Sequence, residues 1–315
     1  NRKIYMIKTI GIIGAGSVGS MLLSYLFPKY RDDFYLLATG DRAVRMRDKG
    51  VCINGQTYHP VIYSDPAQDI GIDVLIIATK TYALESVISD IRPLIRETTI
   101  LLPILNGISA TKRLMEAFPQ NRVFYGLILR TDAYRAGHKV YFNTSGEFQM
   151  GYALNKDPAP EVVEVCEFLR AAGVNANIHE DMLRAQWRKW LLNTGAGQAA
   201  VEIGVECGYF GEVSEIVEIM RLCMDEILLL AKAEHVELTE QDRDEIIEML
   251  INFPAQKKMS MLQDVEAGRP LEIDEYAGMV VKLGKKHGIP TPINQLIYLT
   301  IRARELVSTS RKHIS

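Results

Sequence analysis

Three glycines near the start of the chain have the spacing of a turn that binds a dinucleotide. Gly14, Gly16 and Gly19 form a G-x-G-x-x-G pattern between an apolar run, Ile10–Ile13, and a segment of helical periodicity. In such a turn the first glycine permits a tight bend, the second lets the backbone approach a pyrophosphate, and the third lets the helix pack against the strand. The helix N-terminus adds N–H groups and a positive dipole end. The alternative is an ordinary tight turn. The predicted cofactor contacts in this turn are Gly14, Ala15, Gly16, Ser17, Val18 and Gly19.

A second group of polar residues follows the next predicted strand, residues 34–38. An NAD site usually has an acidic side chain about 20 residues after the glycines. Here Asp41 lies beyond a glycine, where it also suits a helix N-cap. Thr39, Arg42 and Arg45 carry donors for the 2′-phosphate of NADPH, and the alternative for the arginines is a solvated helix face. We therefore expect NADPH as the cofactor.

The elements that must position these residues alternate in type through the first half of the chain. Amphipathic segments such as 83–95 and 111–118 follow most of the apolar runs. This alternation predicts an α/β fold, a Rossmann-type doubly wound parallel sheet with helices on both faces. The pair Asn54-Gly55 predicts a hairpin turn. The predicted buried strands are Ile10–Ile13, 34–38, 74–78, 99–105 and 123–129.

From about residue 180 the pattern changes to successive helices. A helix and strand at 161–178 precede this change, and Gly173 and Gly288 suit the C-terminal ends of helices. The predicted domains are a dinucleotide-binding Rossmann domain at 1–179 and an all-helical substrate and catalytic domain at 180–315. The predicted helices of the second domain are 182–194, 212–233, 239–250, 274–287 and 291–305.

Composition limits the classes of function. The chain has 315 residues, 48% of them hydrophobic, which is enough for two domains with cores of their own. Basic residues are outnumbered and form no runs, which argues against a nucleic-acid partner, and no apolar stretch approaches the length needed to cross a bilayer. The residues before Met6 belong either to the native chain or to an added extension. Four scattered cysteines without metal-site spacing predict small core residues in a reducing cytoplasm and no metal: Cys52, Cys166, Cys207 and Cys223.

Two later segments resemble the ketopantoate reductase (2-dehydropantoate 2-reductase) family. They are WRKWLLN at 187–193 and SMLQDVEAGRPLEID at 260–274. The second has a Ser-Met, an Asp four residues after the Ser, a Gly-Arg, and a Glu-Ile-Asp in the family's order and spacing. The resemblance spans nearly the whole chain. It implies NADPH-dependent reduction of 2-dehydropantoate to D-pantoate, on the route to pantothenate and coenzyme A.

This resemblance implies roles for individual residues. Lys189 matches the proton donor, and Glu272 matches the carboxylate that binds the substrate hydroxyl and balances the lysine. A lysine ammonium suits a general acid because its acidity responds to burial. Asn193, four residues later, lies on the same helix face. The implied substrate contacts are Lys80, Asn106, Asn193 and Ser260, and the further implied cofactor contacts are Lys80, Asn106 and Glu272.

Each of these residues also has a structural interpretation. Lys189, between Trp187 and Trp190, suits a surface lysine whose stem covers apolar surface. Glu272 suits a carboxylate at a helix start, with Asp274 as the N-cap. The other structural alternatives are a helix cap at Ser260, a simple turn at Asn106 and a solvated loop charge at Lys80.

Three departures from the family pattern leave the substrate and the cofactor open. Thr39 stands where the family often has Arg, and Gly197 stands where a second Asn usually follows the first. Gln198 is the candidate to replace that lost contact. The stretch 130–151 also differs from the family's glycine-rich version. The alternatives are a reductase of another branched 2-oxo acid and a non-catalytic NADP-binding regulator. The expected partners are a small-molecule 2-oxo acid and, as an open alternative, a second copy in a homodimer.

Overall fold

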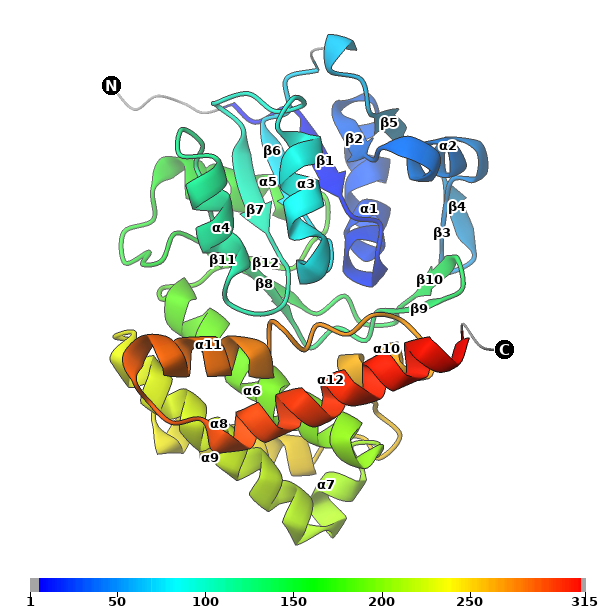
Figure 1. The fold of residues 1–315 in the computed structure, drawn as a ribbon. Helices are drawn as coiled ribbons and strands as arrows, with labels where there is room; N and C mark the ends of the chain where they lie inside the picture. Colours follow the sequence, from blue (N-terminus) through cyan, green and yellow to red (C-terminus); the bar gives the residue numbers. More distant parts are fainter. Residues whose placement is uncertain (1–5, 69, 313–315) are drawn as a thin grey trace. The chain divides into compact units, whose positions relative to one another are not determined.

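The structure, a computed structural model, describes residues 6–68 and 70–312, so the residues before Met6 lie outside the described part of the chain. The chain divides into two compact units, Asn1–Leu183 and Arg184–Ser315. In Figure 1 the first unit runs from blue to green and contains all the strands that the structure describes. The assignment of the cofactor to the first unit and the substrate to the second remains a prediction.

A five-stranded parallel sheet forms the centre of the first unit, in the order β5-β2-β1-β6-β7. Ile10 of the central strand pairs with Phe34 on one side and Val74 on the other. Three of the strands are buried at every position, as a sheet covered on both faces requires. This confirms the predicted parallel sheet. Its strands are β1 (Ile10–Ile13), β2 (Phe34–Leu37), β5 (Val61–Tyr63), β6 (Val74–Ile77) and β7 (Ile100–Pro103).

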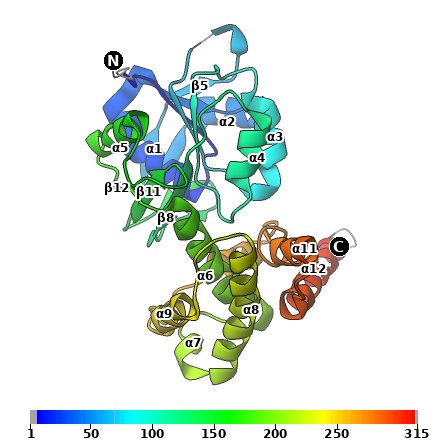
Figure 2. The same cartoon turned by 90° about the vertical axis from the view of Figure 1, so that its left-hand side faces the viewer.

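Helices cover both faces of this sheet, and each face has its own hydrophobic core. Ile10 and Ile12 of β1 belong to one core and Ile13 to the other, as the alternation of side chains along a strand requires. Figure 2 shows α1 and α5 on one side of the sheet, with α3 and α4 on the opposite side. The helices of this unit are α1 (Ser17–Tyr30), α2 (Gly40–Lys49), α3 (Leu84–Ile91), α4 (Ala110–Ala117) and α5 (Pro160–Ala171).

The predicted strand 123–129 does not join the parallel sheet as expected. Val123 makes only an isolated parallel bridge to Leu101 of β7. The chain then leaves the parallel sheet, and β8 (Tyr125–Leu129) pairs antiparallel with β11 (Glu147–Gly151). A third strand, β12 (Ala176–Ile178), completes this separate three-stranded sheet. The prediction that this strand belongs to the parallel sheet was therefore wrong. Its main partner is β11, which lies at the end of the stretch 130–151.

The predicted hairpin at Asn54-Gly55 is confirmed. It joins β3 (Val51–Ile53) to β4 (Gln56–Tyr58). Asn54 and Gly55 have φ values of 48° and 82°, as a two-residue type I′ turn requires. The Asn54 amide also donates to the carbonyl of Phe142 at 2.9 Å. This contact holds the hairpin against β9 (Tyr134–Ala136) and β10 (Lys139–Tyr141) in a four-stranded sheet.

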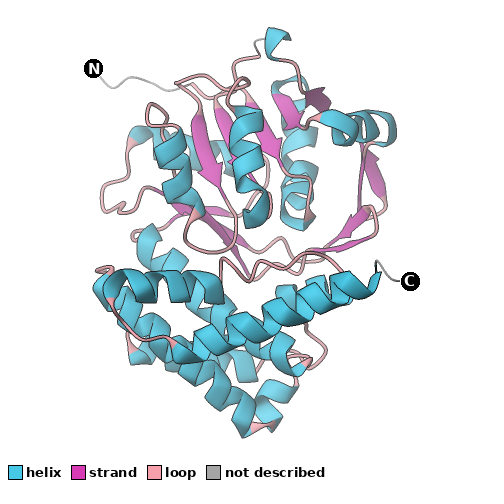
Figure 3. Cartoon of the chain, viewed as in Figure 1, coloured by secondary structure: helices cyan, strands magenta, loops and turns pink. Residues whose placement is uncertain are grey.

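The second unit is helical throughout the part that the structure describes, as Figure 3 shows. The first helix continues to Ile203 although its predicted end was 194. The local glycines weaken helix propensity, but tertiary packing maintains the helix. The helices are α6 (Met182–Ile203), α7 (Tyr209–Glu212), α8 (Ser214–Ala233), α9 (Glu240–Ile251), α10 (Ser260–Glu266), α11 (Ala277–His287) and α12 (Pro292–Lys312).

Two of the predicted helix ends are confirmed and two predicted caps are wrong. Gly288 ends α11 in the left-handed conformation, and Gly173, with φ of 88°, follows the end of α5. Asp41 is not an N-cap, because α2 begins one residue earlier and Thr39 occupies the cap position. Asp274 is not one either, because Tyr276 precedes the first residue of α11.

The cysteines are free thiols, and three of the four are buried as predicted. Cys52 is half-buried instead. Burial raises the pKa of Cys207 to about 11 and that of Cys223 to about 12, which makes both thiols inert near neutral pH. In the described ranges no helix is long and apolar enough to cross a membrane.

Candidate active site

The first and third glycines of the turn are required by packing. Gly14 has a φ of +104°, and a Cβ there would lie 2.5 Å from the carbonyl oxygen of Ala78. A Cβ on Gly19 would lie 1.9 Å from the carbonyl oxygen of Gly14. Both clashes involve backbone atoms, which cannot rotate away. Gly14 therefore lets the turn approach the segment that follows β6, and Gly19 lets α1 pack against the turn.

The second glycine is in a different environment. The nearest heavy atom to a Cβ built on Gly16 is the carbonyl oxygen of Ala78, at 3.9 Å. Gly16 is the N-cap of α1, and no acidic residue lies in the first turn of that helix. The neighbouring Ser17 and Val18 are half-buried. An open backbone at a helix N-terminus is what a pyrophosphate requires, so the turn fits a dinucleotide.

A group of arginines lies near the end of β2. Partial burial of its guanidinium and the positive charges of Arg135 and Arg45 lower the pKa of Arg42. Thr39, exposed, donates from Oγ1 to a carboxylate oxygen of Asp90 at 3.2 Å. Arg135 lies on β9, within residues 130–151, where the sequence departs from the family pattern. It was not identified from the sequence as a site residue, because no local pattern links it to α2. The arginines favour an anion here, whereas the Asp90 carboxylate opposes one.

Lys80 and Asn106 follow neighbouring strands of the parallel sheet. Lys80 comes after β6 and Asn106 after β7, and both are half-buried. The carboxyl ends of β1, β6 and β7 lie at one edge, since Ala78 N donates to Ile13 O and Ile104 N donates to Ile77 O. The structure thus brings these two residues to the same sheet edge as the glycine turn. Their roles toward a ligand remain predictions.

In the second unit, Lys189 and Glu272 interact electrostatically. Lys189 lies half-buried on α6, and Glu272 is only 4% exposed. Burial lowers the pKa of Lys189 to about 8, and the carboxylate of Glu272 acts in the opposite direction. An amine with such a pKa exchanges a proton near neutral pH, whereas a fully solvated surface lysine does not. The structure therefore brings together the two predicted catalytic residues.

A buried tryptophan holds the lysine's helix to the segment that carries Glu272. Trp190 Nε1 donates to the carbonyl oxygen of Glu275 at 2.9 Å. Trp187 packs edge-to-face on Trp190 with ring centroids 5.2 Å apart. The backbone N–H of Glu275 in turn donates to the carbonyl of Glu272 at 2.9 Å. The tryptophans beside Lys189 are therefore core residues that fix its position.

An ion pair inside the 260–274 motif was missed as a positioning element. Arg269 Nε donates to Asp264 Oδ1 at 2.7 Å, and the carboxylate is 5% exposed. The backbone N–H of Arg269 donates to the carbonyl of Asp264 at 2.9 Å, around Gly268 with φ of 62°. This turn reverses the chain after α10 and leads it to Glu272. The spacing of the Asp and the Gly-Arg was visible in the sequence, but their pairing was not.

The other predicted substrate contacts lie on α6 and α10. Asn193 is half-buried one turn after Lys189, and Ser260 is exposed as the first residue of α10. Met259 is the N-cap of that helix, so the helix-cap interpretation of Ser260 is wrong. Within the described ranges neither Asn193 nor Ser260 has a side-chain hydrogen bond, and their contacts with a substrate remain predictions.

Gln198 does not replace the asparagine that the family has at position 197. Its side chain is fully buried, and its amide donates to Asn294 Oδ1 at 3.1 Å. Asn294 in turn donates to Glu226 at 2.7 Å. Gln198 is thus part of the polar network in the core of the helical unit.

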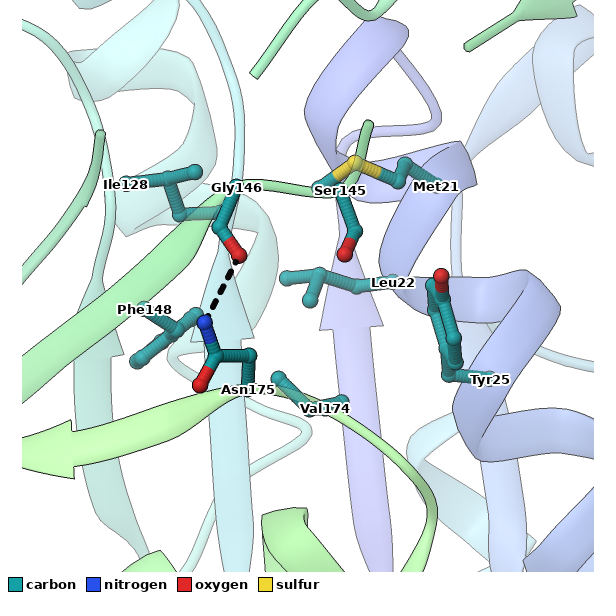
Figure 4. Close-up of a pocket in the computed structure, with 9 residues that line it drawn as sticks. All are labelled: Met21, Leu22, Tyr25, Ile128, Ser145, Gly146, Phe148, Val174 and Asn175. Atoms are coloured by element: carbon teal, nitrogen blue, oxygen red, sulfur yellow. Dashed lines mark hydrogen bonds between the residues drawn. The ribbon is translucent and has the colours of Figure 1, made fainter. Parts of the chain in front are cut away.

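A small pocket in the first unit contains none of the predicted site residues. Figure 4 shows Asn175 donating to the carbonyl of Gly146, at 3.3 Å, on one side of it. It has room for about one water molecule, far less than a dinucleotide or a 2-oxo acid needs. Its lining residues are Met21, Leu22, Tyr25, Ile128, Ser145, Gly146, Phe148, Val174 and Asn175.

Comparison with known proteins identifies the family. Residues 10–155 match the model of "Ketopantoate reductase PanE/ApbA", and residues 181–305 match that of its C-terminal region. A 2-dehydropantoate 2-reductase of Aquifex aeolicus is 25% identical over 96% of this chain and 98% of its own length. A dimeric ketopantoate reductase from Staphylococcus aureus has a TM-score of 0.78 at 21% identity, covering 95% of this chain and 99% of its own. D-mandelate dehydrogenase, solved with NADH and anilino(oxo)acetate, has a TM-score of 0.83 at 23% identity, covering 94% and 98%. The chain belongs to the ketopantoate reductase family of oxidoreductases.

Proposed function

We propose that this chain reduces 2-dehydropantoate to D-pantoate with NADPH, in pantothenate and coenzyme A biosynthesis. The observation that carries the proposal is the half-buried Lys189, whose pKa is lowered to about 8 beside the buried Glu272. A general acid is most effective when its pKa is near the working pH. The relative from Aquifex aeolicus bears the name of this reaction.

In this proposal NADPH, when bound, supplies the hydride for the carbonyl carbon. Lys189 Nζ donates a hydrogen bond to the carbonyl oxygen and then transfers its proton as negative charge develops there. Glu272 favours the charged form of Lys189 and accepts a hydrogen bond from the substrate hydroxyl. Asn193 and Ser260 donate further hydrogen bonds to the substrate. The amine left on Lys189 regains a proton from water before the next turnover.

The first unit binds the cofactor in this proposal. The turn Gly14 to Gly19 holds the pyrophosphate, supported by the open backbone at Gly16. Arg42 and Thr39 contact the 2′-phosphate, and Lys80 and Asn106 line the nicotinamide end. These assignments place the cofactor at the carboxyl-terminal edge of the parallel sheet, where ligands bind in open α/β folds.

The direct test follows oxidation of NADPH and of NADH by the purified protein with 2-dehydropantoate. Rapid oxidation of NADPH with formation of D-pantoate is the expected result. Tight cofactor binding without reduction of any 2-oxo acid would overturn the proposal and favour the non-catalytic regulator. Turnover of a different 2-oxo acid would favour the second candidate, a related reductase of another branched 2-oxo acid.

The cofactor assignment predicts a selective effect of Arg42→Ala. Loss of a charge-assisted hydrogen bond to a phosphate should raise the KM for NADPH by about tenfold to a hundredfold. The KM for NADH, which has no 2′-phosphate, should hardly change. Arg47→Ala, on the last turn of the same helix, is the matched control. An equal effect on both cofactors, or a native preference for NADH, would contradict the assignment of Arg42 to the 2′-phosphate. It would show that the Asp90 carboxylate outweighs the arginines in determining which cofactor binds.

We also propose a homodimer in the cytoplasm. The dimeric relative from Staphylococcus aureus supports the assembly, and four unpaired cysteines suit a reducing compartment. Light scattering after size-exclusion chromatography should give twice the chain mass of 35.4 kDa. A mass equal to one chain would contradict the dimer.

A further inference from the structure

Arg135 lies in the stretch of the chain that departs from the family pattern, residues 130–151. This stretch contributes β9 and β10 to the small sheet with the strand order β4-β3-β10-β9. In that sheet Arg135 is opposite Val140 of β10, and Val140 is in turn opposite Ile53 of β3. Because β3 begins just after α2 ends, the hairpin of β9 and β10 is joined to the helix that carries Arg42 (Figure 1).

The side chain of Arg135 lies on the inner face of this small sheet. Residues directly opposite each other on neighbouring strands project to the same face, so Arg135 shares a face with Val140 and Ile53. Both of these residues are buried, Arg135 is half-buried, and β9 and β10 pack against α1. Nε of Arg135 donates to the carbonyl oxygen of Gly137 at 2.8 Å, which attaches the guanidinium to its own hairpin. Arg135 is therefore held on the side that faces α1, the helix that begins at the glycine turn.

Arg135 brings a positive charge close to two others on α2. Burial, followed by the charges of Arg135 and Arg45, lowers the pKa of Arg42. In the part of the chain that the structure describes, neither Arg42 nor Arg45 forms an ion pair with a carboxylate. The nearby Asp90 carboxylate accepts a hydrogen bond from Thr39 instead. Like charges held together repel one another, and a bound anion would remove this repulsion.

A phosphate ester is the anion that suits such a group of arginines. It carries up to two negative charges and three acceptor oxygens, and the planar guanidinium binds these oxygens in pairs. In the proposed function the pyrophosphate of the cofactor lies at the turn Gly14 to Gly19. The arginines lie beyond the end of β2, on the first turn of α2 and on β9. The phosphate of NADPH that remains for them is the 2′-phosphate.

We infer that Arg135 binds the 2′-phosphate of NADPH together with Arg42. It thereby provides the charge that Thr39, a neutral residue where the family often has arginine, does not provide. The inference rests on the NADPH part of the proposed function, because it concerns the cofactor of the same reaction. Arg135 determines cofactor specificity in this view, and it takes no part in hydride or proton transfer.

The test measures the binding of two nucleotides to the whole chain by isothermal titration calorimetry. Adenosine 2′,5′-bisphosphate and adenosine 5′-monophosphate differ only in the 2′-phosphate, and the native protein should bind the bisphosphate more tightly. Arg135→Gln removes the charge but keeps an amide that can donate to the carbonyl of Gly137. In this variant the Kd for the bisphosphate should rise about tenfold to a hundredfold, whereas the Kd for the monophosphate should hardly change.

Lys139→Ala is the matched control from the same hairpin. Lys139 is exposed and precedes Val140 on β10, so its side chain projects from the opposite face of the sheet. Its loss removes one positive charge from the hairpin and should leave both dissociation constants near their native values. An equal loss of bisphosphate binding in Lys139→Ala and Arg135→Gln would overturn the inference, because only the general charge of the hairpin would then matter.

The melting temperature distinguishes a binding role of Arg135 from a structural one. If its charge mainly repels Arg42 in the free protein, Arg135→Gln should melt at the native temperature or above it. A lower melting temperature together with equal weakening of both nucleotides would overturn the inference, since Arg135 would then maintain the fold rather than bind the phosphate.

The outcomes also separate this inference from the proposed reaction. If Arg135→Gln loses the preference for the bisphosphate but the native protein does not reduce 2-dehydropantoate, the inference holds and the proposed reaction fails. If the native protein binds both nucleotides equally, the inference fails. Reduction of 2-dehydropantoate with NADH would in that case still support the reductase.

Discussion

Replacement of Lys189 by alanine is expected to lower kcat for ketone reduction by about 10²–10⁴-fold, the usual contribution of a positioned general acid. Cofactor affinity, measured by fluorescence titration, should stay close to that of the native protein. Alanine also leaves Glu272 buried, at 4% exposure, without the opposing charge. Some loss of stability therefore accompanies the loss of activity, because the buried carboxylate loses a favourable electrostatic interaction.

Lys189→Arg separates these two effects. Arginine retains the positive charge beside Glu272 but does not release a proton at accessible pH. This variant should therefore unfold at a denaturant concentration nearer to that of the native protein and still lack proton-transfer activity. Nearly native kcat in both variants would exclude Lys189 as the proton donor.

The pH dependence of the native enzyme follows from the same residue. Reduction requires the ammonium form, and burial lowers the pKa of Lys189 to about 8, so kcat for reduction should fall as the pH rises through about 8. Oxidation of the hydroxy acid requires the neutral amine and should show the opposite slope. Glu272 opposes the lowering, so in Glu272→Gln the fall should begin at lower pH. A kcat independent of pH across this range would contradict the assignment.

The sequence was sufficient for the parts of the fold that form between neighbouring segments. The strand β1, the glycine turn and the helix α1 follow each other directly in the sequence. The Asn54-Gly55 hairpin depends only on the residues of its own turn. The departure of β8 was not predictable in this way, because it pairs with β11 across the stretch 130–151. The extension of α6 through Gly195 depends on packing against Met224. Helix propensity is a local property and does not predict such a tertiary contact.

The same distinction applies to the site. The spacing of four residues placed Lys189 and Asn193 on one helix face without further information. The pairing of Lys189 with Glu272 came only from resemblance to a family, since the tertiary fold brings the two segments together. Arg135, near Arg42, has no sequence signal at all. Long-range electrostatic contacts of this kind depend on topology, and the period of a single segment does not show them.

The second large expected effect concerns the glycine turn. Two variants, Gly19→Ala and Gly16→Ala, each add one methyl group to the native chain. In Gly19→Ala the new Cβ would lie 1.9 Å from the carbonyl oxygen of Gly14, a backbone atom, so α1 must move away from β1. Overpacking of a fixed core of this kind should lower the free energy of unfolding by about 3 kcal/mol or more. Urea denaturation measures the loss directly.

Gly16→Ala is the matched variant and should behave in the opposite way. Its Cβ would lie 3.9 Å from the nearest protein atom, so the free energy of unfolding should stay within about 1 kcal/mol of the native value. The same methyl group would occupy the space through which a pyrophosphate approaches the backbone, so NADPH affinity should fall at least about tenfold. Normal NADPH binding by a stable Gly16→Ala protein would mean that this turn packs β1 against α1 without holding the dinucleotide.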